Sequence, residues 1–131
     1  MIKILLISLI LSGSVNHEIQ SKLFQKYLND FHKAKIEKAE VKYYIIRQNN
    51  CYKCHVENLN LAKRIIKDKN VKIIYVYNGR INKEAEFIRK SRKVLLDSTE
   101  AFLKININPF SDCVIRTTNG KISKITQINN E

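Results

Sequence analysis

The alternation of two hydrophobic periods along the chain constrains the fold more than any other sequence feature. Short runs rich in β-branched and aromatic residues predict strands, at 41–47, 71–77, 93–96, 112–117 and 121–125. Between them, apolar residues recur every three to four positions and predict helices, at 17–38, 51–68, 81–92 and 98–105. Strands separated by helices pair in parallel, because a crossover helix returns the chain to the same end of the sheet. The sequence therefore predicts an α/β fold.

The two ends of this pattern add an N-terminal helix and a C-terminal hairpin. Ile19, Leu23, Tyr27 and Phe31 recur every four residues and predict the buried stripe of the first helix, which Phe24 and Leu28 widen. The turn Thr118-Asn119-Gly120 joins the last two strands into an antiparallel hairpin at the edge of a mixed sheet. The chain has 131 residues and no linker or internal repeat, so we expect a single folded domain over 41–131 preceded by the helix at 15–40.

The first residues have the pattern of a secretory signal peptide. Lys3 is followed by the apolar run 4–11 and then by the small residues Ser12, Gly13 and Ser14. We therefore predict a signal peptide over residues 1–14 and a periplasmic or otherwise exported protein. The alternative is that the run is a buried first strand of a cytoplasmic domain. The run is too short to span a bilayer, so membrane contact is expected at most through an uncleaved N-terminal segment.

The charge of the chain is strongly positive, with 24 Lys and Arg against 12 Asp and Glu and a formal net charge of +12. Such a field favours acidic partners. The lysines are spread over every segment, however, and no RNA-binding motif or zinc-finger spacing accompanies them. We therefore do not expect a nucleic-acid partner.

The pair Cys51 and Cys54 is the spacing that carries chemistry, since CxxC falls where the first strand joins the next helix. Three alternatives to a redox pair remain: two structural thiols, a zinc site with Cys113, and covalent haem. The haem motif is complete through His55, with His17 or His32 as the sixth ligand. A zinc site is disfavoured because adjacent Cys54 and His55 rarely reach one ion. Haem is disfavoured because the strand-rich flanks of the motif resemble no small cytochrome. We therefore expect no metal or cofactor.

The positions of the two cysteines in the first turn of the helix predicted over 51–68 indicate the role of each. Helix N-terminal amides stabilise the Cys51 thiolate, and Lys53 and His55 add positive potential when charged. Cys51 is then the attacking thiol and Cys54 the resolving thiol. His55 is expected to be a solvated residue of the first turn, and Cys113 a core thiol on its strand, the sharper alternative being a third redox thiol near the site.

With these motifs, residues 40–126 resemble the thioredoxin-like fold, and in particular its TlpA/ResA-like thiol–disulfide oxidoreductase branch. The resemblance rests on strand–CxxC–helix, Glu57 three residues after the second cysteine, an extra strand and helix before Pro109, and the final Asn119-Gly120-Lys121-Ile122 hairpin. Departures are Asn50 in place of the usual Trp, Leu59 in place of a Pro, and no closing helix after the hairpin, whose face the N-terminal helix would cover instead.

The resemblance also implies site residues. Pro109 would be a cis-proline facing the disulfide, with Asn108 beside it, and Glu57 a partly buried carboxylate that assists proton transfer. Tyr52 and Lys53 would join Pro109 and Asn108 in contacting substrate.

We therefore expect an exported thiol–disulfide oxidoreductase that acts in cell redox homeostasis by exchanging its Cys51/Cys54 disulfide with protein thiols and with an unidentified redox partner. The alternative from another class is a non-catalytic thioredoxin-like binding module whose basic surface holds an acidic partner.

Overall fold

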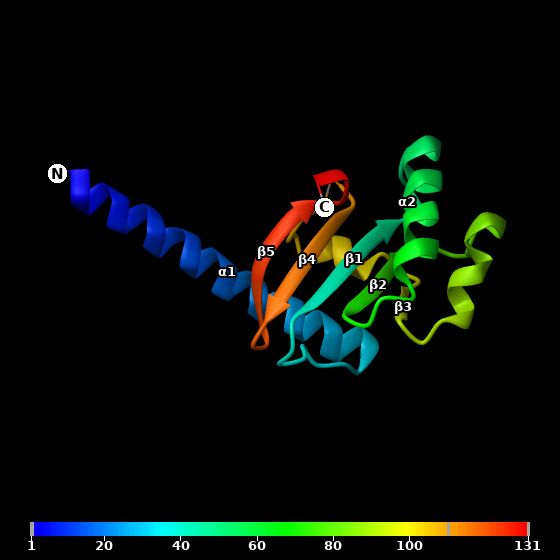
Figure 1. Ribbon diagram of the computed structural model, residues 1–131, viewed down its shortest axis with the longest axis horizontal. Coiled ribbons are helices and arrows are strands. Elements are labelled where there is room, and N and C mark those ends of the chain that lie inside the picture. The colour runs from blue at the N-terminus through cyan, green and yellow to red at the C-terminus, as the bar shows by residue number, and fades with distance from the viewer. Residues whose placement is uncertain (1, 110, 131) are drawn as a thin grey trace.

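The computed structural model describes residues 2–109 and 111–130, and side chains from residue 17 to 129 apart from residue 110. Within these residues lies a five-stranded mixed sheet in the order β3-β2-β1-β4-β5 (Figure 1). The helices are α1 (Ile2–His32), α2 (Tyr52–Ile65) and α3 (Ala101–Lys104), together with the 3₁₀ segments η1 (Lys83–Lys90) and η2 (Ile128–Asn130). The predicted α/β class and mixed sheet are confirmed.

The strands follow the sequence prediction closely. Parallel pairing joins β1 (Val41–Arg47) to β2 (Val71–Val76), and β2 to β3 (Val94–Asp97). The hairpin of β4 (Cys113–Thr118) and β5 (Lys121–Gln127) is antiparallel, with β4 also antiparallel to β1. Its two-residue turn places Asn119 at φ 54° and Gly120 at φ 76°, the left-handed pair that a tight hairpin requires.

Each face of the sheet has its own core. Because successive strand residues point to opposite faces, Tyr43 and Ile45 of β1 pack with α1 and α3, whereas Tyr44 and Ile46 pack with α2 and η1. Helix α1 therefore covers the face opposite to α2, as the resemblance suggested. Within the described residues, the chain after β5 forms only the short 3₁₀ segment η2.

Helix α1 differs from its prediction in both its end and its buried face. It ends at His32 instead of residue 38, because Lys33 adopts a left-handed conformation at φ 52°. Phe24, Tyr27 and Leu28 are buried, whereas Ile19, Leu23 and Phe31 of the expected stripe are exposed. Only one part of the predicted stripe, that of Phe24, Tyr27 and Leu28, is therefore buried.

The shorter helices also differ from the predicted ones. Residues 83–90 form a 3₁₀ helix instead of the α-helix expected over 81–92, and the helix expected over 98–105 is reduced to Ala101–Lys104. Glu100, the N-cap residue of α3, makes no side-chain cap and has φ 54°. Asp97 instead accepts the N–H groups of Ala101 and Phe102.

The N-terminal turns of α1 extend past the sheet in Figure 1. Among the described residues, no helix is long and apolar enough to cross a membrane. The signal peptide predicted over residues 1–14 lies outside the described part of the chain in two respects: Met1 is not described, and neither are the side chains of residues 2–14.

Candidate redox site

The two cysteines lie at the join between β1 and α2, and they are joined as a disulfide. Cys51 is the N-cap residue of α2, and its Sγ accepts the N–H of Cys54 at 3.0 Å. The side chain of Asn50 accepts the N–H of Cys51 at 2.8 Å, which fixes the loop before the helix. A thiolate at Cys51 would keep this helix N–H as a donor, and that favours its charged form.

The two cysteines differ in exposure. Cys51 is exposed and Cys54 is half-buried. Between them, Tyr52 is 78% exposed and Lys53 is also exposed. The arrangement matches the predicted order of reactivity, because a substrate approaching from solvent meets Cys51 before Cys54. It also leaves Tyr52 and Lys53 free to contact that substrate.

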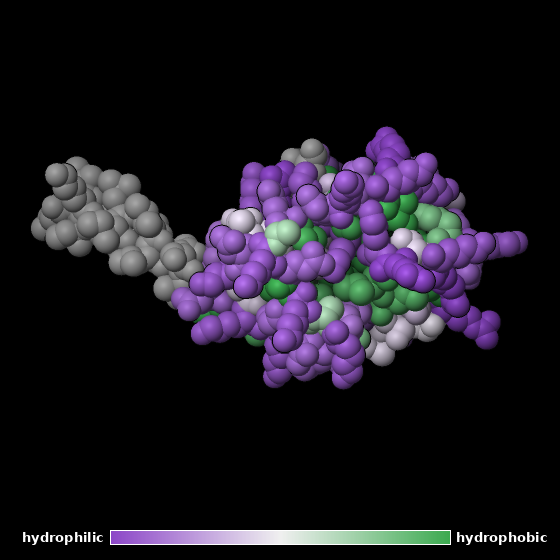
Figure 2. Space-filling model, turned by 60° about the horizontal axis from the view of Figure 1, so that its bottom comes forward, coloured by the Kyte–Doolittle hydropathy of each residue, from purple (hydrophilic) through white to green (hydrophobic). Residues whose placement is uncertain are grey.

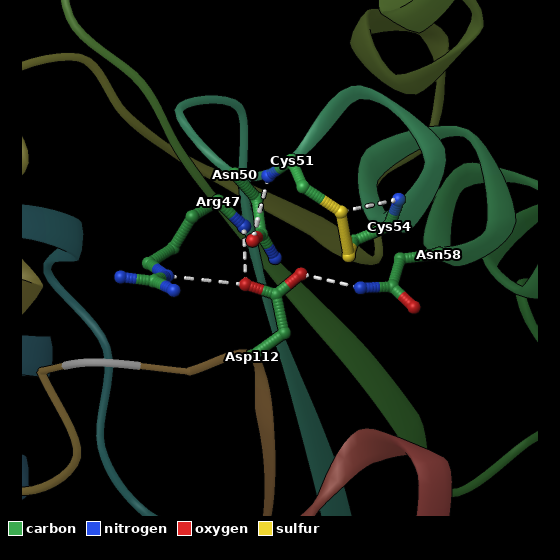
Figure 3. Close-up of a disulfide and its surroundings, with 6 residues drawn as sticks. All are labelled: Arg47, Asn50, Cys51, Cys54, Asn58 and Asp112. Carbon is green, nitrogen blue, oxygen red and sulfur yellow. Dashed lines mark hydrogen bonds and ion pairs between the residues drawn. A yellow bond between two sulfur atoms is a disulfide. The ribbon is translucent and has the colours of Figure 1, made fainter.

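A buried carboxylate that sequence reasoning did not select lies beside Cys54. Asp112, just before β4, is 4% exposed and accepts the backbone N–H and the Nε–H of Arg47 at 3.1 and 3.2 Å. Its other oxygen accepts the Nδ2–H of Asn58 at 2.5 Å. In Figure 3 the Asn58 amide and the Asp112 carboxylate lie below the disulfide, toward its Cys54 sulfur.

A polar cavity of about 180 Å³ connects this carboxylate to the disulfide. Its wall includes Cys54, Asn58, Asp112, Arg47, Asn50 and Ser111. A cavity of this size with several polar groups has room for water. Cys54 and Asp112 therefore line the same cavity.

The topology explains why these residues meet. Because β4 runs antiparallel to β1, the start of β4 lies beside the end of β1, where Ile45 pairs with Cys113. Asn58 follows Cys54 by one helical turn and so faces the same side of α2. A charged residue directly before a buried strand, at the sheet end that carries the cysteines, was the sequence signal for Asp112.

Glu57 does not have the expected environment. It is exposed, not partly buried. The buried residues of α2 are His55, Asn58, Leu59 and Ala62, a helical stripe from which Glu57 points away, since it is displaced from His55 by about 200° around the helix.

His55 is also placed differently from its expectation, because it is 2% exposed instead of solvated. Its Nε2 lies 2.8 Å from the hydroxyl of Tyr75, which donates to the side chain of Gln48 at 2.8 Å. Burial lowers the pKa of His55, and Glu84 and Asp112 oppose this in part. The neutral ring therefore adds little positive potential to the cysteines near neutral pH.

Pro109 and Asn108 contact the site less directly than expected. No peptide bond in the described residues is cis, so Pro109 is not the cis-proline that the resemblance implied. Its carbonyl accepts an Nη1–H of Arg47 at 2.9 Å, and Asn108 accepts the hydroxyl of Ser111 at 3.2 Å. The cavity wall near the disulfide is formed by Ser111 and Asp112 instead.

The third cysteine is a core thiol, as predicted. Cys113 is fully buried and unpaired. Burial raises its pKa to about 12, an effect to which Asp112 adds and which Asn108 and Arg47 oppose. A thiol with so little thiolate character at neutral pH is a poor nucleophile.

Metal-ligating side chains do not gather in the part of the chain that the structure describes, where no group of three His, Cys, Asp or Glu residues could hold an ion. The cysteines are bonded to one another, and His55 turns inward to Tyr75. Comparison with protein-family models, with curated proteins and with solved structures finds no match to this chain.

Proposed function

We propose that this chain is a thiol–disulfide oxidoreductase of thioredoxin-like architecture that exchanges the Cys51–Cys54 disulfide with protein thiols. The observation that carries the proposal is a disulfide at the N-terminus of α2 whose leading sulfur is exposed and accepts a helix N–H. The strand order and the final hairpin are compatible with the architecture. Because a signal peptide is predicted over residues 1–14, we further propose that the reaction takes place outside the cytoplasm.

In the reducing direction, the Cys51 thiolate attacks one sulfur of a substrate disulfide. A mixed disulfide forms at Cys51, and the second substrate sulfur leaves as a thiolate. Cys54 then loses its proton, and its thiolate attacks Sγ of Cys51. The bond to the substrate breaks, the substrate departs as a dithiol, and two electrons have passed from the chain to the substrate. The same steps in reverse oxidise a substrate dithiol.

Asp112 takes the proton-transfer role that sequence reasoning gave to Glu57. Its carboxylate shares a polar cavity with Cys54, whereas Glu57 is exposed. Arg47 and Asn58 hold both oxygens of Asp112 in place. The proton of Cys54 would pass across the cavity to this carboxylate as Cys54 attacks.

A redox titration in glutathione buffers, followed by thiol alkylation and mass measurement, tests the proposal. We expect one reversible two-thiol transition at Cys51 and Cys54, with Cys113 unreactive in the folded chain. The midpoint gives the direction of exchange in the cell. A chain with no reversible transition at these cysteines would overturn the proposal.

Trapping experiments test the roles of the two sulfurs. In Cys54→Ser, mixed disulfides with substrate proteins should accumulate on Cys51, because the resolving thiol is absent. Cys51→Ser is the matched control and should trap far less, since Cys54 is half-buried. Equal trapping by both variants would contradict the assigned order.

The non-catalytic binding module makes a different prediction for the same chain. Partner binding would then survive removal of both cysteines and fall steeply with salt. Lys22, Lys26, Lys35 and Lys121, which line one groove of the molecule, would supply positive charge for such binding.

A further inference from the structure

An open groove of about 740 Å³ lies between α1 and the β4–β5 hairpin, and four lysines line it. Lys22 and Lys26 come from α1, Lys35 from the segment after it, and Lys121 from the start of β5. The volume is in the range of ligand-binding sites. We propose that this lysine groove binds an extended acidic segment of a partner protein, a function separate from disulfide exchange.

The positive charge of the groove is largely unneutralised. Lys22 lies 3.9 Å from Glu18, with both side chains mostly exposed. Across the described residues, Lys26, Lys35 and Lys121 form no ion pair. The groove lining therefore carries four lysines and one carboxylate, that of Glu18, and an acidic ligand would supply the missing counter-charges.

The floor of the groove is held in place by buried polar contacts. The hydroxyl of Ser21 accepts the N–H of Ile122 at 2.9 Å, which attaches α1 to β5. The side chain of Gln25 accepts the N–H of Ile36 at 2.8 Å and donates to the carbonyl of Ala34 at 3.3 Å. A preformed groove binds its ligand without first having to order itself.

Lysine spacing suits a peptide in extended conformation. Lys22 and Lys26 are one helical turn apart, a rise of about 6 Å. Alternate residues of an extended strand are about 6.6 Å apart and point to the same side. Acidic side chains at every second position would therefore meet both lysines.

The same groove lacks the features of a phosphate site. No arginine lines it, although arginine is the usual residue for bidentate phosphate contacts. The chemistry thus favours carboxylates over nucleic acid.

The groove lies at the opposite end of the sheet from the disulfide. The start of β1, at Val41, pairs with Thr117 next to the hairpin turn, whereas Cys51 follows the far end of the strand. A strand of this length separates the two sites by about 20 Å. Figure 2 brings this end of the molecule forward and shows hydrophilic side chains around a hydrophobic band. A partner held here leaves the cysteines accessible.

Binding of a fluorescent peptide that alternates Glu and Ser tests the proposal, with a Gln–Ser peptide as its neutral match. Fluorescence anisotropy of the full chain at about 50 mM salt should show saturable binding of the acidic peptide alone. Lys26→Glu combined with Lys121→Glu should weaken this binding by about tenfold or more, because attraction becomes repulsion. The control, Lys67→Glu with Lys90→Glu, makes the same change of net charge at exposed positions outside the groove.

Three results would overturn the proposal: no binding of the acidic peptide, equal weakening by the control variant, or tighter groove-dependent binding of a single-stranded oligonucleotide than of the peptide. Thermal unfolding and the glutathione titration are run on both variants to show that each is folded and exchanges its disulfide normally. Because the titration reports on the cysteines alone, failure of the lysine groove and failure of the oxidoreductase proposal give distinct results.

Discussion

Two aspartates buried at strand ends have opposite surroundings, and they differ in what their carboxylates can do. Asp97 closes β3 and is 3% exposed. Its oxygens accept the hydroxyl of Tyr27 at 2.8 Å and the N–H groups of Ala101 and Phe102 at 2.9 and 2.8 Å. These contacts bind α1, β3 and α3 together. Asp97 is a structural group whose lone pairs are used by the fold.

Asp112 lies at the end of the sheet that carries the disulfide. Arg47 and Asn58 hold it on the protein side, and its remaining surroundings are the polar cavity shared with Cys54. Burial of a carboxylate is costly in both cases and is offset by hydrogen bonds. The difference is that Asp112 lines a cavity together with Cys54, which is why the proposed function assigns proton transfer to Asp112 and not to Asp97.

A tyrosine–histidine pair lies near each aspartate, with His32 half-buried and His55 buried. The hydroxyl of Tyr27 donates to Asp97, so it accepts from Nε2 of His32 at 2.9 Å. The hydroxyl of Tyr75 donates to Gln48 and accepts from Nε2 of His55 in the same way. The two pairs therefore differ in their acceptor, because Tyr27 donates to the aspartate itself and Tyr75 donates to Gln48.

The largest effect should come from removing the structural carboxylate. Asp97→Ala leaves a buried hydroxyl and two backbone N–H groups without acceptors, so the free energy of unfolding should fall by about 3 kcal/mol or more. Urea denaturation measures this. Asp68→Ala, at an exposed position, is the control and should change stability by less than about 0.5 kcal/mol. Equal effects of the two changes would remove the structural role of Asp97.

Asp112→Asn should act on rate more than on stability. The amide keeps much of the shape but cannot accept a proton, so release of the mixed disulfide by Cys54 should slow by about tenfold or more near neutral pH. Stopped-flow measurement of exchange across pH checks this, with Asp68→Asn as the matched control. An unchanged rate and pH profile would make Asp112 a second structural aspartate and end the comparison.

Stability should fall in acid because of both histidines. Burial lowers the pKa values of His32 and His55, although nearby carboxylates oppose it. Below about pH 6.5 the unfolded chain then binds more protons than the folded chain, so stability decreases as pH falls, by up to about 1.4 kcal/mol per pH unit for each histidine. His55→Gln should reduce the difference between urea midpoints at neutral and acidic pH. A difference as large as that of the unmodified chain would contradict this.

The smallest effect is expected at Glu57. Since its side chain is exposed, Glu57→Gln should leave both the rate of exchange and its pH profile within about twofold of the unmodified chain. Measured beside Asp112→Asn, it sharpens the comparison between a carboxylate in the cavity and one in solvent. A shifted profile for Glu57→Gln alone would return the proton-transfer role to that residue.

Local pattern predicted the strands and the cysteine site well. Bounds of the strands were close because β-branched runs and the Asn119-Gly120 turn are local signals. The position of CxxC between β1 and α2 was also correct, since it depends only on the order of adjacent elements. Helix ends were less accurate: a left-handed Lys33 ended α1 early, and 83–90 adopted 3₁₀ geometry.

Site residues distant in the sequence could not be found by the same means. Asp112 is more than fifty positions from Cys54 and reaches it through the antiparallel pairing of β1 with β4. Burial of His55 and exposure of Glu57 depend on which side of α2 meets the sheet, and a helix with several apolar and polar candidates leaves that choice open.

By itself, then, the sequence determined the α/β class, the hairpin, the position of the cysteine pair and the excess of positive charge, because each depends on residue type and near neighbours. The tertiary structure decided which carboxylate lies beside the disulfide, which aspartate is structural, and where the lysines gather. These properties depend on strand order and on the packing of each helix against the sheet, which bring together side chains that no local pattern relates.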